Sequence, residues 1–145
     1  MRALAYLCGF FVGFASLAFS DPHQHGGHGH GMVEITNYEK PPSISLEVFS
    51  DAKSGYNLHV KTRNFRFAPE LINTSNLEGQ GHVHLYINGE KRRVYGPWVH
   101  LAKIPQGEVA LQADLCANTH DVYTVHGKPV RDRVIITADG KVVRP

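Results

Sequence analysis

The chain has 145 residues, of which 15 are Lys or Arg and 13 are Asp or Glu, so its formal net charge at pH 7 is +2. This length allows one folded domain, and a charge so close to neutral gives no electrostatic basis for binding nucleic acid or an anionic membrane surface. Hydrophobic residues make up 42% and charged residues 19%, which is typical of a globular chain and not of a disordered one. Ten residues are histidine, an enrichment that indicates metal binding.

Residues 1–20 have the pattern of a secretory signal peptide. Arg2 precedes an apolar run over residues 3–15, and the small residues Ala18 and Ser20 occupy the third-last and last positions before the expected cleavage site. The alternative is an uncleaved membrane anchor, for which the apolar run is only marginally long. We therefore expect a periplasmic or secreted protein that has no membrane association once the signal is removed.

Residues 21–40 predict a disordered, histidine-rich arm and linker. Histidine and glycine alternate at its start, a composition that cannot build a core. Neutral imidazole is a common ligand of copper, zinc and nickel, and Met32 adds a soft sulfur that suits Cu(I). The arm's predicted metal ligands are His23, His25, His28 and His30. The alternative is a solvated linker whose metal affinity is incidental.

Residues 41–145 predict an antiparallel, all-β sandwich of the Ig-like or cupredoxin-like kind. Apolar and polar residues alternate with period two in short segments separated by turn residues, and no segment carries a capped helical stripe. Asn88–Gly89 between two such segments is a strong hairpin signal, because both central residues of the tight turn need positive φ. The expected strands cover residues 44–48, 56–60, 83–87, 109–115 and 134–137.

Histidines within this domain predict a second group of metal ligands. On a strand, His82 and His84 point to the same face. His120 follows the expected strand 109–115, and the loops of a sandwich gather at its two ends, so distant histidines can meet there. The predicted ligands are His82, His84, His100 and His120, with Asn118 or Asp121 orienting them. We expect His59 and His126 to be ordinary hydrogen-bonded or solvent-facing side chains.

Cys116 and His120 introduce an alternative. The Cys-x-x-x-His spacing resembles the Cys…His segment of blue-copper cupredoxins, in which an earlier histidine, here His82 or His84, is also a ligand. The usual axial Met is missing after His120. A type 1 copper electron carrier with Cys116 as thiolate ligand therefore remains an alternative hypothesis.

The stretch 81–130 resembles small exported Ig-like or cupredoxin-like β-sandwich domains of the periplasmic copper-handling kind. The resemblance rests on the run His-Val-His-Leu-Tyr-Ile-Asn-Gly, on Ile104-Pro105-x-Gly107 opening a strand, and on Asn118-Thr-His120-Asp121 before a closing hairpin. It implies metal binding at His82, His84 and His120, with copper as the ion.

These patterns predict a metal-binding protein that buffers, transports or delivers copper, with zinc as the alternative ion. Its expected partners are the ion itself and another periplasmic metal-handling protein, with no nucleic acid. We expect no enzymatic activity, because the chain has neither a Gly-x-Ser-x-Gly elbow nor a His-Glu-x-x-His pair. The remaining alternative is a β-sandwich interaction module whose histidine tail is incidental.

Overall fold

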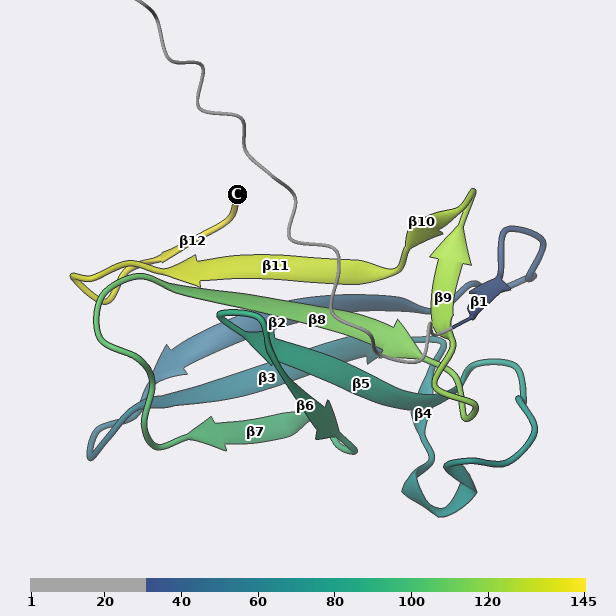
Figure 1. The fold of residues 1–145 in the computed structure, drawn as a ribbon, viewed down its shortest axis with the longest axis horizontal. Coiled ribbons are helices and arrows are strands. Elements are labelled where there is room, and N and C mark those ends of the chain that lie inside the picture. Colours follow the sequence, from purple (N-terminus) through teal and green to yellow (C-terminus); the bar gives the residue numbers. More distant parts are fainter. Residues whose placement is uncertain (1–30) are drawn as a thin grey trace, which may run out of the picture.

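The protein consists of two β-sheets (Figure 1). The structure is a computed structural model, and it describes residues 31–145. The predicted all-β, mostly antiparallel sandwich-like architecture is confirmed. The larger sheet contains β1 (Met32–Glu34), β4 (Arg66–Phe67), β5 (Gln80–Ile87), β6 (Glu90–Val94), β8 (Val109–Cys116), β9 (Val122–Val125), β10 (Lys128–Pro129), β11 (Arg131–Ile136) and β12 (Val142–Val143). The smaller sheet contains β2 (Ser43–Ser50), β3 (Tyr56–Arg63) and β7 (Trp98–Leu101). A short 3-10 helix, Pro69–Leu71, precedes β5.

The core lies between the two sheets, because each strand turns alternate side chains inward. On β5, Val83 and Leu85 are fully buried, and they face Leu58 and Val60 of the smaller sheet within one apolar cluster. Burying such a side chain contributes about 1.5–3 kcal/mol to stability. The β5 side chains that alternate with Val83 and Leu85 lie on the opposite face of the larger sheet, where the candidate site is found.

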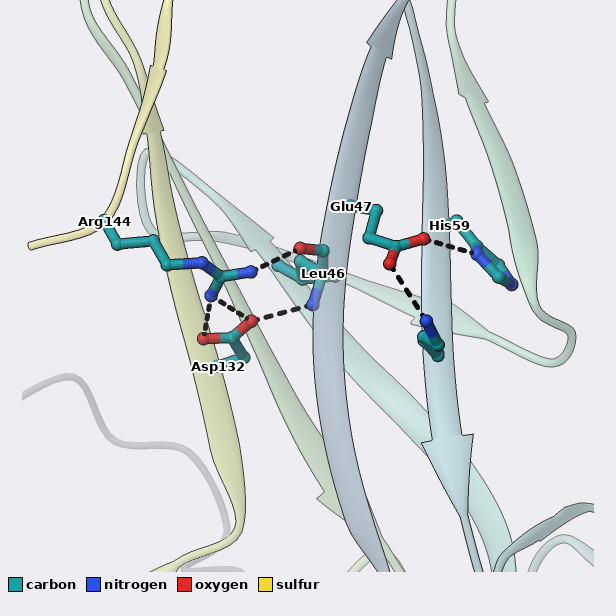
Figure 2. Close-up of polar contacts among 6 residues, drawn as sticks. Leu46, Glu47, His59, Asp132 and Arg144 are labelled. Atoms are coloured by element: carbon teal, nitrogen blue, oxygen red, sulfur yellow. Dashed lines mark hydrogen bonds and ion pairs between the residues drawn. The ribbon is translucent and has the colours of Figure 1, made fainter.

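Side chains also join the two sheets at the edge strand β2 (Figure 2). The amide of Leu46 donates a hydrogen bond to Asp132 Oδ2 at 2.8 Å, and its carbonyl accepts one from Arg144 Nη2 at 2.8 Å. Arg144 Nη1 donates to both carboxylate oxygens of Asp132, at 2.7 and 2.6 Å. Backbone groups of an edge strand can otherwise pair with another chain. Asp132 and Arg144 therefore protect β2 while they tie it to the larger sheet.

The folded part begins earlier than the sequence predicts. Residues 32–35 do not belong to a disordered linker, because β1 pairs in parallel with β9 and Ile35 is fully buried in the core. A strand of three residues is too short to carry a period-two signal, and for this reason the predicted boundary at residue 41 is too late. The predicted signal peptide and the arm histidines His23, His25, His28 and His30 lie outside the described residues.

The predicted hairpin at Asn88–Gly89 is confirmed. Both residues have positive φ, 48° and 86°, and they connect β5 to β6 with Ile87 paired to Glu90. The Asn88 side chain also accepts a hydrogen bond from the amide of Ala110 at 2.8 Å, which fixes the turn against the start of β8. The hairpin therefore sets the register of β5. Among residues 31–145 no helix is long and apolar enough to cross a membrane.

Candidate metal centre

Strand β5 carries two histidines on the face of the larger sheet that points away from the core. His82 and His84 are two residues apart and both are fully buried, while Val83 between them faces the core. Their cross-strand partners on β8 are Cys116 and Asp114, respectively. The alternation of β5 therefore separates an apolar face that builds the core from a face with two imidazoles.

The third histidine, His120, lies in the turn between β8 and β9. Its amide donates to the carbonyl of Ala117 at 3.0 Å, and the amide of Ala117 donates to the carbonyl of Asp121 at 2.9 Å. His120 has a φ of 72°, in the left-handed region that non-glycine residues rarely occupy. Backbone strain of this kind persists only where the surroundings fix it, and it concentrates at functional sites.

These three imidazoles converge on one point. His82 Nε2 lies 3.0 Å from His84 Nε2 and 2.9 Å from His120 Nδ1. One ligand atom from each residue can be chosen so that all lie within 4.8 Å of one another. A ring nitrogen carries either one proton or one lone pair, so Nε2 of His82 cannot make an ideal hydrogen bond to both neighbours at once. One cation between the three lone pairs would satisfy all of them, and the trio can therefore hold a metal ion.

Asn73 orients the ring of His120. Its Oδ1 accepts a hydrogen bond from His120 Nε2 at 2.9 Å, so the proton is on Nε2 and the lone pair of Nδ1 is directed to His82. A hydrogen bond of this kind to the outer nitrogen fixes the tautomer and the ring orientation of metal-binding histidines. The ligand atoms would then be Nδ1 of His120 and Nε2 of His82 and His84.

The segment that contains Asn73 is bound to the turn of His120 along its length. The amide of Asn73 donates to the carbonyl of Asn118 at 2.9 Å, and Asn118 Nδ2 donates to the carbonyl of Ser75 at 3.3 Å. The amide of Thr119 donates to Asn76 Oδ1 at 3.0 Å. Polar side chains thus hold two loops together that are more than forty residues apart in the chain.

The predicted orienting residues have a different role. Asn118 holds the neighbouring loop through Ser75, and Asp121 accepts a hydrogen bond from Thr119 Oγ1 at 2.6 Å. Asn73, which sequence reasoning missed, accepts a hydrogen bond from the ring of a site histidine. The only signal for it was an asparagine within a polar loop, and Asn73 has a φ of 66° that asparagine tolerates well.

His100 is not brought to the trio. It lies on β7 of the smaller sheet, it is exposed, and its Nδ1 contacts Asn57 Oδ1 at 2.9 Å. His59, on β3 of the same sheet, contacts Glu47 at 3.0 Å and stacks on Trp98 with ring centroids 4.3 Å apart. Figure 2 shows the pair of Glu47 and His59. His59 is therefore the hydrogen-bonded side chain that the sequence predicts.

Cys116 is buried beside the trio, but its sulfur is not part of the group. Within the described chain, the ligand atoms that gather here are the three imidazole nitrogens. Burial and, to a smaller extent, the nearby carboxylate of Asp114 raise the pKa of the Cys116 thiol to about 12. The thiol donates weakly to the carbonyl of Asp114, with sulfur and oxygen 3.6 Å apart. Cys116 is thus held as a neutral thiol next to the histidines.

Charges around the trio are paired or lie at the rim. Asp114, opposite His84, is nearly buried and forms an ion pair with Arg131 at 2.8 Å. Burial raises the pKa of Asp114, against the opposing effect of the Arg131 guanidinium. On the other side of β5, the exposed Arg93 of β6 is the cross-strand partner of His84. Repulsion from Arg93 would weaken binding of a cation and favour its exchange.

The chain matches no family model, no curated protein and no solved structure. The resemblance to exported copper-handling sandwich domains therefore remains a prediction from the sequence. The three-histidine centre depends on the sequence pattern and on the geometry of the structure.

Proposed function

We propose that the protein is a periplasmic or secreted metal-binding protein that buffers, transports or delivers copper through His82, His84 and His120. The observation that carries the proposal is the convergence of three imidazole nitrogens within 4.8 Å. Ring nitrogens that lie 2.9 and 3.0 Å from one another are close enough to share one ion.

Copper is the ion that this ligand set supports best. Imidazole nitrogen binds Cu, Zn and Ni, and divalent copper has the highest affinity of the first-row series for a given site. No carboxylate belongs to the group among the described residues, so it lacks the oxygen ligands that Mg²⁺, Ca²⁺ and Mn²⁺ require. The signal-like segment 1–20 and the histidine-rich arm favour an exported metal-handling role.

A trio without thiolate favours storage or transfer over type 1 electron transfer. The position of the Cys116 sulfur outside the ligand group argues against a thiolate–copper bond. We therefore expect the Cu(II)-loaded protein to lack the intense visible charge-transfer band of blue-copper sites. An intense band that disappears in Cys116→Ser would contradict this and favour the electron-carrier alternative.

The test compares two turn histidines that share a backbone conformation. His120 and His126 have φ values of 72° and 50°, and asparagine tolerates this region, so His120→Asn and His126→Asn should both fold. Cu(I), Cu(II) and Zn(II) are titrated against chelators of known affinity. We expect His120→Asn to weaken the tightest site about 100-fold or more, since even residues behind the ligands are worth about 10–100-fold. His126→Asn should leave it unchanged.

Equal affinities of these two variants for every ion would refute the proposed site. A loss that occurs only for Zn(II) would keep the site and replace copper by zinc. Circular dichroism of both variants provides the check that the fold is retained.

A further inference from the structure

Four strands of the larger sheet, in the order β6, β5, β8 and β11, form the outward face that carries His82 and His84. Cross-strand partners share a face of a sheet, and strand pairing places four side chains in one row: Arg93, His84, Asp114 and Arg131. Arg93 and Arg131 at its ends are accessible to solvent, whereas His84 and Asp114 are buried. The row therefore presents an arginine at each edge, with a site histidine between them.

A second row repeats this arrangement one step along the strands. Tyr86 is two residues from His84 and shares its face, and its row consists of Lys91, Tyr86, Gln112 and Arg133. Arg133 Nε donates a hydrogen bond to Gln112 Oε1 at 2.7 Å. Lys91 and Arg133 are exposed, and the neutral Tyr86 and Gln112 between them are half-buried. We call these two rows together the basic face.

Positive charge is concentrated on the basic face. Its two rows hold four basic side chains and one carboxylate, which gives a formal charge of +3 with His84 neutral. The whole chain has a formal charge of +2, so the residues outside the basic face are net negative. On the outward face of the smaller sheet, Glu47 pairs with Lys61 at 3.1 Å and their charges cancel. The excess of positive charge is therefore a property of one face and not of the chain as a whole.

We propose that the basic face binds an acidic segment of another protein, whose carboxylates pair with Arg93 on β6 and Arg133 on β11. Three of the four cations are arginine, which binds planar carboxylates bidentately. Strands β6 and β11 are separated by three strand spacings, about 14 Å. About four or five extended residues span this distance, so one acidic segment can reach both edges of the face.

The composition of the basic face favours a protein partner over a lipid or nucleic-acid surface. Binding to a lipid surface combines basic residues with exposed apolar side chains that enter the bilayer, and the two rows hold no exposed apolar residue. A chain so close to neutral lacks the charge that binds nucleic acid. Between the cations, the Tyr86 hydroxyl and the Gln112 amide are groups that hydrogen-bond to a polypeptide.

A segment that reaches from β6 to β11 crosses the row of His84 and therefore lies beside the trio. Its carboxylates neutralise Arg93, whose charge opposes a cation held by His84. Metal and acidic segment then strengthen each other's binding, because coupling between two sites is reciprocal. This coupling rests on the proposed function, whereas binding of the acidic segment needs no metal.

Fluorescence anisotropy of a fluorescein-labelled decaglutamate peptide, titrated with the metal-free protein, tests the basic face. The test variant is Arg93→Gln/Arg133→Gln. The matched control is Lys53→Gln/Lys103→Gln, which removes the same charge from exposed loop residues outside the face. At an ionic strength of about 0.01 M we expect the arginine variant to weaken binding about fivefold or more and the lysine variant less than about twofold. Binding to the wild type should weaken as the ionic strength rises to about 0.15 M.

Equal affinities of the two double variants would overturn the inference, because net charge alone would then explain binding. Absence of peptide binding at the lower ionic strength would also overturn it. Phosphatidylglycerol vesicles that bind the wild type but not the arginine variant, when the peptide binds neither, would replace the protein partner by a lipid surface. Circular dichroism checks that both double variants are folded.

The proposed function is judged separately by His120→Asn. That variant keeps the basic face, so it should bind the decaglutamate peptide as the wild type does even though it loses the tight metal site. Loss of peptide binding in His120→Asn to the same extent as in Arg93→Gln/Arg133→Gln would contradict the assignment of binding to the two rows.

Discussion

Histidines lie on the outward faces of both sheets, but their surroundings differ. In the smaller sheet, His59 and His100 each contact an acceptor of their own, Glu47 and Asn57. In the larger sheet, the ring nitrogens of His82 contact those of His84 and His120. A histidine beside a carboxylate or an amide oxygen is a satisfied hydrogen-bonding group, whereas histidines whose nitrogens meet one another form a potential metal centre.

The largest expected effect is a difference between the histidines of the two sheets in how much metal raises the Tm of the protein. An ion that binds only the folded state, at a free concentration of 100 times its Kd, adds about 2.7 kcal/mol to the free energy of unfolding. For a domain of this size, that corresponds to an increase of about 10 °C in Tm. His82→Ala/His84→Ala should abolish the Tm increase on adding Cu(II), whereas His59→Ala/His100→Ala should retain it. Differential scanning calorimetry with and without copper measures both. An equal increase in the two double variants would place the stabilising metal elsewhere.

A smaller effect should come from the residue that orients His120. Asn73→Gly keeps the left-handed backbone and removes the acceptor of His120 Nε2, so metal affinity should fall about 10–100-fold. Asn64→Gly is the control, because Asn64 has a φ of 51° and its side chain donates a hydrogen bond to the carbonyl of Pro41 at 3.3 Å. Chelator competition on both variants measures the difference. If both lose affinity equally, backbone flexibility and not orientation is responsible.

The smallest effect concerns acid pH and the strand beside the trio. Hydrogen bonds from Thr36 and the amide of Gly127 lower the pKa of Glu34 from 4.5 to about 2. A lowered carboxyl pKa adds stability that is complete above about pH 4.5 and is lost as the pH falls toward 2. The protection factor of the Val122 amide in hydrogen exchange, which compares its rate with that of an unprotected amide at the same pH, should therefore fall over this interval as β1 loosens. In Glu34→Gln this pH-dependent loss of protection should be absent.

In the smaller sheet, Glu47 provides the comparison for this titration. Contacts with His59 and Lys61 lower the pKa of Glu47 as well, but its protonation should leave exchange at Val122 unaffected. A Glu47→Gln variant that changes the Val122 profile as much as Glu34→Gln would show that the acid response is global and not a property of β1.

Much of the fold could be predicted because its signals are local. The alternation in β5 predicts both the buried face of Val83 and the histidine face, and Asn88–Gly89 predicts the hairpin that places Arg93 opposite His84. The meeting of His120 with this pair follows from the way sandwich loops gather at one end. The parallel pairing of β1 could not be predicted, because three residues carry no period and their partner is 90 residues away.

Details of the site depend on long-range packing that the sequence does not display. His100 alternates with apolar residues as His82 does, yet β7 belongs to the other sheet. Asn73 reaches His120 across 47 residues of chain, through loops whose hydrogen bonds only the folded structure defines. The histidine pattern thus indicates which residues are candidates, and strand pairing decides which of them meet.

The separation of the site residues along the chain determines the order of folding and metal loading. His82 and His120 are 38 residues apart, and they approach only when β8 pairs with β5 and the turn after β8 closes. Contacts this distant in sequence form slowly and late, because loop closure opposes them. A chain in which β5 and β8 have not yet paired therefore lacks the trio of His82, His84 and His120. If the trio binds metal as proposed, loading of this site requires the folded domain, and binding at the trio would report that this part of the fold is complete.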